Sequence, residues 1–185
     1  MIVGVDEVGR GPLAGPVVAA AVILCPGGIH GLADSKVLKP AARTALAAEI
    51  NARCLVGIGS ASVAEIDERN ILQATMLAMM RAVSALGVSP REILVDGNRC
   101  PDWRWPSRAI VGGDGLEPCI SAASIVAKVW RDSYMAELHH EFPHYGWDSN
   151  VGYGTPAHRT ALDQYGPTPH HRRSFAPVAR HFAAI

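Results

Sequence analysis

Residues 1–16, MIVGVDEVGRGPLAGP, carry the most informative pattern in the sequence. The apolar run before Asp6 and Glu7 predicts an N-terminal β-strand that ends at Asp6, and the glycines and prolines that follow predict a sharp turn. Residues 15–24, rich in valine and alanine, predict a second strand antiparallel to the first. Two carboxylates and accessible glycine backbone therefore meet at a strand end, which suits a divalent cation beside a phosphate. For this segment alone, solvated acids in an ordinary turn are the alternative.

The rest of the chain alternates between strand and helix patterns. We expect strands over residues 55–62, 92–96 and 108–111, and helices over residues 40–53, 70–86, 118–142 and 156–165. The expected buried stripe of the longest helix consists of Ile120, Ala123, Ala127, Trp130, Tyr134 and Leu138. The pattern is typical of an α/β fold. We expect a catalytic domain over residues 1–145 and a small helical appendage, packed on it, over residues 146–185.

Composition excludes some classes of protein. Seventeen basic residues balance 17 acidic residues, which argues against nucleic-acid binding by bulk charge, although the basic segment 169–175 permits contacts with a few phosphates. No apolar run approaches the ~20 residues of a membrane span, and the N-terminus does not look like a secretory leader. The four cysteines form no Cys-x-x-Cys motif. We therefore expect a soluble, cytoplasmic protein with reduced, mostly buried thiols.

Carboxylates stand at the carboxyl ends of three expected strands: Asp6, Asp96 and Asp114, with Glu7 beside the first. In open α/β sheets this edge is where ligands bind. Taken singly, each aspartate is better explained as a turn cap. Four acids brought together, however, repel one another by several kcal/mol unless cations lie between them. We therefore predict a metal centre, in which two ions can serve phosphodiester cleavage.

Basic and hydroxyl side chains suggest contacts with a nucleic-acid backbone. In the longest helix, spacings of three, four and three place four residues on one stripe: Ser121, Ser124, Lys128 and Arg131. A solvated face is the alternative. Arg172 and Arg173 are further candidates for phosphate contacts, with paired surface charge as the alternative. We assign no metal to His170 and His171, because no third ligand has a suitable spacing.

Seven sequence blocks resemble bacterial ribonuclease HII, in the family's order and over nearly the whole chain. They are residues 6–16, 34–36, 95–97, 113–114, 120–129 with 131–132, 152–155 and 170–175. The resemblance implies a ribonuclease H-like mixed sheet flanked by helices, and an endonuclease that cuts the RNA strand of RNA/DNA hybrids. It also implies cutting 5′ of single ribonucleotides in duplex DNA, with 3′-hydroxyl and 5′-phosphate ends and two Mn²⁺ or Mg²⁺ ions.

The same resemblance implies roles for single carboxylates. The metal ligands would be Asp6, Glu7, Asp96 and Asp114. Asp6 would lie between the two ions and Asp114 on the ion that activates water, with Glu7 and Asp96 on the leaving-group side.

The resemblance also implies substrate contacts. The backbone of Gly9, Arg10 and Gly11 would hold the 2′-hydroxyl that distinguishes RNA from DNA. Tyr153 would stack on the next sugar, although without the resemblance a core or rim aromatic is the better reading. Lys36, in the Asp-Ser-Lys block, joins the candidate contacts.

Three positions depart from the family, in which lysine is common where this chain has Val37, Gly112 and Val151. The absence of these three lysines should weaken phosphate binding. The expected partners are RNA/DNA hybrid and ribonucleotide-containing duplex DNA, with a sliding clamp as a candidate, and we expect a monomer. Ribonuclease HIII or another nuclease of this fold is the enzymatic alternative, although no extra N-terminal domain is evident. A hybrid-binding module without catalysis is the non-enzymatic alternative, which the four acids disfavour.

Overall fold

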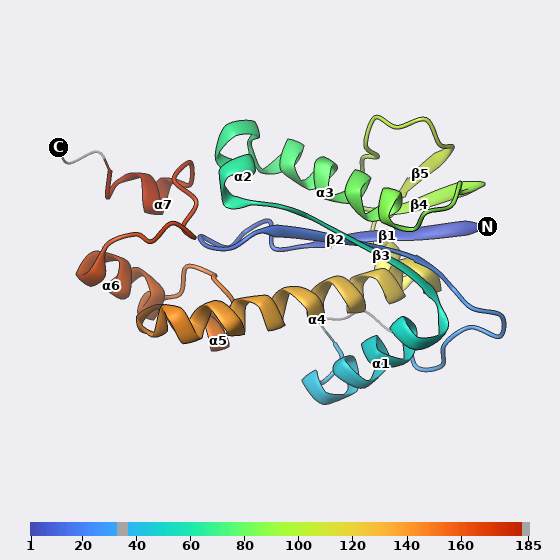
Figure 1. Cartoon of the computed structure of the whole chain (residues 1–185), viewed down its shortest axis with the longest axis horizontal. Coiled ribbons are helices and arrows are strands. Elements are labelled where there is room, and N and C mark those ends of the chain that lie inside the picture. The colour runs from blue at the N-terminus through green and yellow to red at the C-terminus, as the bar shows by residue number, and fades with distance from the viewer. Residues whose placement is uncertain (33–36, 183–185) are drawn as a thin grey trace.

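A five-stranded mixed sheet forms the centre of the molecule in this computed structural model, which describes residues 1–32 and 37–182 (Figure 1). The strands are β1 (Ile2–Val8), β2 (Val17–Ile23), β3 (Leu55–Ala61), β4 (Glu92–Asp96) and β5 (Ser107–Ile110). Their order is β3-β2-β1-β4-β5. Strand β2 runs antiparallel to both neighbours, whereas β1, β4 and β5 are parallel. The predicted mixed α/β sheet is confirmed.

Helices cover both faces of this sheet. These helices are α1 (Pro40–Arg53), α2 (Val63–Arg69), α3 (Ile71–Ala85) and α4 (Pro118–Glu141). Helices α2 and α3 lie on one face, and α1 and α4 lie on the other (Figure 1). The remaining elements are the 3₁₀ turns η1 (Gly113–Gly115) and η2 (Pro143–Tyr145) and the helices α5 (Trp147–Asn150), α6 (Pro156–Tyr165) and α7 (Ala176–Ala179).

The central strand β1 is held between the two helical layers. Val3 and Val5 are fully buried against the α3 layer. On the other face, α4 packs directly on the strand backbone: a Cβ atom added to Gly4 would lie 2.1 Å from the carbonyl carbon of Cys119. This close approach fixes the carboxyl end of β1, and with it Asp6 and Glu7, between α3 and α4.

Two local expectations were wrong. Strand β1 does not end at Asp6: it continues to Val8, which pairs with Val18 of β2. Helix α2 was not expected, although Ser62 and Glu65 form a capping box that marks its start. The Ser62 hydroxyl accepts from the Glu65 N–H, and the Glu65 carboxylate accepts from the Ser62 N–H.

The buried stripe of α4 follows the prediction only in part. Ile120, Ala123, Ala127 and Leu138 are buried, but Trp130 is 37% exposed and Tyr134 is half-buried. Arg131 and Met135 occupy the interior positions instead. The reason is that α4 leaves the sheet at this point and packs under residues 13–16 and the C-terminal segment.

The C-terminal segment packs on the second half of α4 through a cluster that includes Tyr145, Trp147, Leu162 and Val178. The Asp67 carboxylate of α2 also ties it down by accepting hydrogen bonds from the N–H groups of residues 173 and 174. The domain boundary at residue 145 stays a prediction.

Two expectations drawn from composition can be compared with the structure. Cys119 is buried, but Cys25, Cys54 and Cys100 are partly exposed, so the expectation of mostly buried thiols was wrong. No helix in the described part of the chain is both long and apolar enough to cross a membrane.

Candidate metal centre

Strands β1 and β4 bring three carboxylates together at the carboxyl ends of the two strands. Val5 pairs in parallel with Val95, so Asp6 and Asp96 follow at the same level of neighbouring strands. One carboxylate oxygen each from Asp6, Glu7 and Asp96 lies within 4.8 Å of the others. Carboxylate oxygens at this spacing are the hard donors that Mg²⁺ and Mn²⁺ prefer. The donor set therefore fits a divalent cation.

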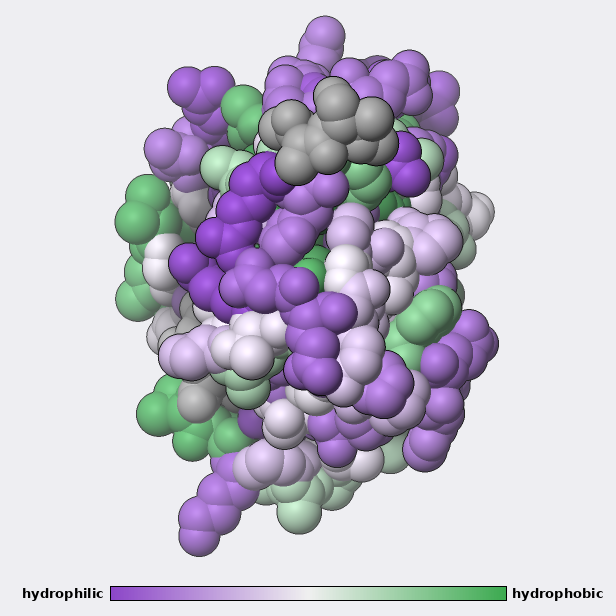
Figure 2. Space-filling model, turned by 90° about the vertical axis from the view of Figure 1, so that its left-hand side faces the viewer, coloured by the Kyte–Doolittle hydropathy of each residue, from purple (hydrophilic) through white to green (hydrophobic). Residues whose placement is uncertain are grey.

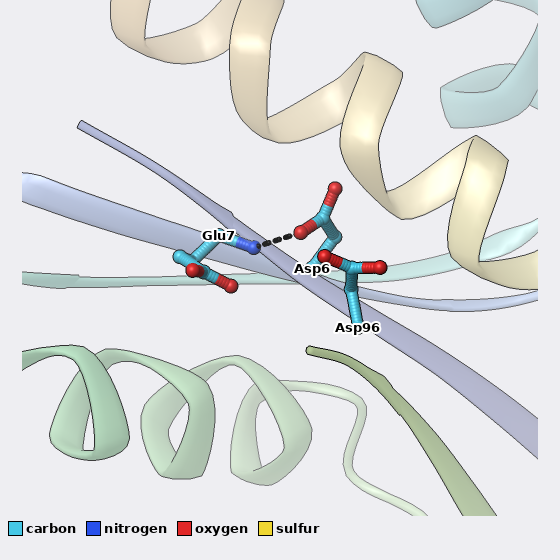
Figure 3. Close-up of side chains that lie close together, drawn as sticks. All are labelled: Asp6, Glu7 and Asp96. Atoms are coloured by element: carbon cyan, nitrogen blue, oxygen red, sulfur yellow. Dashed lines mark hydrogen bonds between the residues drawn. The ribbon is translucent and has the colours of Figure 1, made fainter. Parts of the chain in front are cut away.

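Asp6 and Glu7 are adjacent in a continuous strand, yet both reach this group. Figure 3 shows the Asp6 carboxylate directed toward α4 and the Glu7 side chain on the α3 side, with Asp96 beside Asp6. The pairing of β1 with β4 stops at Val5 and Val95, so the edge of β1 is open beyond that point. We attribute the approach of Glu7 to this open edge. Glu7 therefore reaches the group although the strand continues through Val8.

Burial and mutual repulsion act on these carboxylates. Burial, followed by the charges of Glu7 and Asp96, raises the pKa of Asp6 well above its usual value, while a hydrogen bond from Ser124 opposes the rise. Burial also raises the pKa of Glu7, with Asp96 adding to the effect and Arg10 opposing it. The Glu7 N–H donates to Asp6 Oδ1 over 2.7 Å. A bound cation would favour the ionised form of all three acids.

Asp114 lies in the 3₁₀ turn η1 and is 8% exposed. Its backbone N–H is 3.4 Å from Asp96 Oδ1, and its carbonyl accepts from the Ser121 hydroxyl over 2.6 Å. Its carboxylate is outside the group of three within the described residues. The backbone of Asp114 thus lies beside the Asp96 carboxylate. The role of the Asp114 carboxylate as a fourth metal ligand stays a prediction.

The connection after β1 lies beside the carboxylates. The Arg10 guanidinium is 3.4 Å from Glu7 Oε1. Tyr153 is 46% exposed, and a Cβ atom added to Gly11 would lie 3.3 Å from its ring. Gly9, with a φ of 89°, starts the turn. The predicted glycine-rich contact segment and the predicted stacking tyrosine are therefore neighbours in space.

The expected phosphate-contacting stripe of α4 does not exist as a surface. Ser121 and Ser124 are buried, and Arg131 is fully buried. Lys128 is half-buried and pairs with Asp132 over 2.7 Å. Because α4 packs directly against β1, the Ser121 hydroxyl donates to the Asp114 backbone carbonyl and Ser124 hydrogen-bonds to the Asp6 carboxylate.

The basic C-terminal block also differs from expectation. Arg172 is fully buried and donates to backbone carbonyls, so its predicted contact with phosphate was wrong. Arg173 is exposed, with its guanidinium 4.6 Å from the centre of the Phe182 ring. Lys36 lies outside the described residues.

A pocket of about 250 Å³ opens beside Glu7 and Asp96 on the α3 side. Its polar lining includes Arg10, Asn98 and Arg99. Sequence reasoning missed Asn98 and Arg99, although both directly follow the carboxyl end of β4, where ligand-binding residues are expected. The exposed Arg99 adds positive charge to the approach to the carboxylates.

A mixed sheet with an acidic cluster at the carboxyl edge of parallel strands, flanked by helices, is the architecture of the ribonuclease H-like metal-dependent nucleases. The ribonuclease HII family model matches residues 3–178. The chain therefore belongs to the ribonuclease HII family, whose members are hydrolases that cleave the RNA strand of RNA/DNA hybrids.

Individual relatives agree with this assignment. The chain is 66% identical to ribonuclease HII of Sphingopyxis alaskensis over 97% of its own length and 91% of that protein. Its structure resembles the PCNA:RNase HII complex from Archaeoglobus fulgidus, with a TM-score of 0.80, 26% identity and coverage of 98% and 96% of the two chains. It also resembles Bst-RNase HIII in complex with Mn²⁺, with a TM-score of 0.75, 18% identity and coverage of 98% and 69%.

Proposed function

We propose that this enzyme hydrolyses the RNA strand by a two-metal-ion mechanism and also cuts 5′ of single ribonucleotides embedded in duplex DNA. The products would be 3′-hydroxyl and 5′-phosphate ends. The observation that carries the proposal is the group of carboxylates from Asp6, Glu7 and Asp96 within 4.8 Å. No cysteine or histidine belongs to this group in the described part of the chain. The donor set favours an ion with hard oxygen ligands.

Four carboxylates would form the metal centre. Asp6, Glu7 and Asp96 would hold the ions, and Asp114 would complete the site from η1. Divalent ions held there would supply an activated water and would stabilise negative charge on the phosphodiester. Either Mn²⁺ or Mg²⁺ fits; the Mn²⁺ bound to the structurally similar Bst-RNase HIII supports this choice.

The segment from Gly9 to Gly11, with Tyr153 beside it, is the proposed reader of the ribose. The exposed ring of Tyr153 can stack on a sugar, and the adjacent glycine backbone can approach a 2′-hydroxyl closely. The end of the molecule that carries α6 and α7 is predominantly hydrophilic, with hydrophobic groups in separate patches (Figure 2).

Three further assignments belong to the proposal. We assign the enzyme to the cytoplasm, where its hybrid substrates arise, and we expect it to act as a monomer. A sliding clamp is a candidate partner, which the Archaeoglobus fulgidus complex of RNase HII with PCNA supports.

A cleavage assay on three substrates tests the proposal. The substrates are an all-RNA/DNA hybrid, a DNA duplex with one ribonucleotide and the same duplex with 2′-deoxyribose at that position, each with Mn²⁺, Mg²⁺ or EDTA. We expect cutting of the first two with either metal and no cutting of the third. A failure to cut the single-ribonucleotide duplex would favour a ribonuclease HIII-like specificity. Binding of the hybrid without cleavage would contradict the proposal and would favour a hybrid-binding module without catalysis.

A further inference from the structure

Two arginines lie buried beneath the segment of residues 9–16 that connects β1 to β2. Arg131 of α4 and Arg172 of the C-terminal segment are both 0% exposed. They come from distant parts of the sequence and meet the same segment from the inside. Fully buried arginines are uncommon, because removing a charge from water is costly unless polar groups replace the water.

Arg172 is bonded to three carbonyl groups of this segment. Its Nε donates to Gly15 O and its Nη1 to Arg10 O, both over 2.9 Å. Its Nη2 donates to Gly9 O over 2.5 Å. The rigid guanidinium fork therefore fixes three peptide groups at once.

Arg131 completes the arrangement from the other side. Its Nε donates to Pro16 O over 2.9 Å and its Nη2 to Ala14 O over 3.0 Å, while its Nη1 donates to Val151 O. It also fills the space under Gly9, since a Cβ atom added there would lie 2.1 Å from Arg131 Nε. Gly9 is thus required by this contact as well as by its positive φ.

Neither arginine forms a salt bridge within the described residues; their hydrogen-bond acceptors are carbonyl groups. Burial lowers the pKa of Arg131 to about 10 and that of Arg172 to about 9, so both remain cations at neutral pH. Their mutual repulsion contributes to the lowered pKa of Arg172. Two adjacent positive charges thus lie behind a segment that carries the proposed substrate contacts.

The inward carbonyls determine where the amide groups of this segment point. In a planar trans peptide, the C=O of one residue and the N–H of the next point in opposite directions. The Gly9 and Arg10 carbonyls face Arg172, so the N–H groups of Arg10 and Gly11 face away from it. Both residues are exposed, and across residues 1–32 and 37–182 neither N–H donates to a protein acceptor.

We propose that Arg131 and Arg172 are positioning residues for the substrate. They turn the carbonyls of Gly9, Arg10, Ala14, Gly15 and Pro16 inward, present the Arg10 and Gly11 N–H groups to the RNA sugar-phosphate backbone, and add attraction through their buried charge. The inference rests on the proposed function. It assigns affinity for the hybrid to two side chains that do not touch it.

Variants of Arg172 test this inference. Arg172→Gln keeps a neutral donor and removes the charge, whereas Arg172→Lys keeps the charge and loses the fork. Arg53→Gln, an exposed arginine at the end of α1, is the charge-matched control. For each protein we would measure the Kd for an RNA/DNA hybrid in EDTA at about 50 and 200 mM salt, Mn²⁺ affinity by calorimetry, and KM and kcat well below the melting temperature.

For Arg172→Gln we expect the Kd and KM to rise by about tenfold or more and the salt dependence to weaken, with kcat and Mn²⁺ affinity within about threefold of wild type. Arg172→Lys should lie between Gln and wild type, and the control should match wild type. A hybrid Kd within about twofold of wild type, with only a lower melting temperature, would show a purely structural role. If Arg172→Gln lost as much Mn²⁺ affinity as hybrid affinity, Arg172 would act on the metal centre and not on the substrate segment. If Arg172→Lys bound the hybrid as weakly as Arg172→Gln, the buried charge would not contribute.

A measurement on the wild-type enzyme covers the case in which these variants do not fold. In amide NMR spectra without metal, hybrid should shift the Arg10 and Gly11 signals more than that of Gly15, whose N–H bonds to His170 O. No shift at residues 10 and 11 would overturn the inference. If wild type fails to cut hybrids, the proposed function itself fails; if it cuts while Arg172→Gln binds as tightly, only this inference fails.

Discussion

His158 and His171 face each other inside the C-terminal segment, with 3.0 Å between their Nε2 atoms. The His158 Nδ1 lies 2.8 Å from Tyr153 O, which can only accept, so His158 carries its proton on Nδ1. The His171 Nδ1 accepts from the Thr168 N–H, so His171 carries its proton on Nε2 and donates to His158. Both rings are thus neutral. A further proton on His158 Nε2 would break the pair, and one on His171 Nδ1 would remove the hydrogen bond from the Thr168 N–H.

This pair predicts a loss of stability in acid. Burial, followed by the charge of His158, lowers the pKa of His171 to about 3, and burial lowers the pKa of His158. Below the ordinary histidine pKa of 6.5 the unfolded chain therefore takes up protons that the folded protein does not. The contribution is complete above that value and falls by ~1.4 kcal/mol per pH unit per histidine as the pH drops toward the folded value.

Urea unfolding between about pH 7 and 5 measures this effect. Because Asp6 and Glu7 have raised pKa values and act in the opposite direction, the difference between wild type and His171→Gln isolates the histidine. We expect the variant to lose less stability than wild type on acidification. His140→Gln, an exposed histidine of α4, should behave as wild type. Identical pH slopes for wild type and His171→Gln would contradict the account.

Val151 predicts a stabilising substitution. Its φ of 45° and ψ of 33° lie in the left-handed region, which costs a β-branched residue about 1–2 kcal/mol. Val151→Asn should raise the free energy of unfolding by about 0.5–1 kcal/mol, since asparagine tolerates this backbone and the residue is only half-buried. Val111→Asn, at a 76% exposed position, should change stability by less than about 0.5 kcal/mol. A clear destabilisation by Val151→Asn would show that packing outweighs strain there.

Tyr153 predicts a loss of ribose recognition. Because its ring lies against Gly11, Tyr153→Ala should lower kcat/KM for the single-ribonucleotide duplex by about tenfold or more while leaving Mn²⁺ affinity unchanged. Tyr165→Ala removes a similarly exposed ring that stacks on His144 and serves as the matched control. Equal cleavage by Tyr153→Ala and the control would remove Tyr153 from the substrate site.

The crowded carboxylates predict that one of them destabilises the metal-free protein. Asp96→Asn removes one charge beside Asp6 without changing side-chain size, so the melting temperature in EDTA should rise. With Mn²⁺ at about 100 times its Kd, wild type should gain ~2.7 kcal/mol and the variant less. Asp148→Asn, at an exposed position of α5, is the control. A lower melting temperature for metal-free Asp96→Asn would argue against repulsion in the cluster.

Local signals in the sequence predicted most of the fold. Prolines at the starts of α1 and α4 and the Asn70 cap of α3 act within a few residues, so these helix starts were predicted correctly. The length of β1 was not predictable in this way, because it depends on pairing of Val8 with Val18 across the turn. Pairing between the two strands thus extends β1 past the point at which the local sequence suggested that it ends.

The site could be predicted only as far as strand ends determine it. Asp6 and Asp96 follow from the parallel pairing of β1 and β4, whereas the approach of Glu7 depends on where that pairing stops. The burial of Arg131 was missed because charge suggested a surface position. Its place four residues after Ala127 nevertheless puts it on the buried stripe.

The most direct test of the metal-centre assignment is the cleavage rate of Asp96→Asn on the RNA/DNA hybrid and on the single-ribonucleotide duplex, with saturating Mn²⁺ or Mg²⁺. The account predicts that the rate falls by ~10²-fold or more on both substrates, because charge stabilisation at the phosphodiester is lost. Hybrid affinity in EDTA should stay close to that of wild type, because the proposed role of Asp96 is to hold metal and not to position the RNA. A rate within about tenfold of wild type would contradict the assignment of Asp96, and with it the three-carboxylate metal centre.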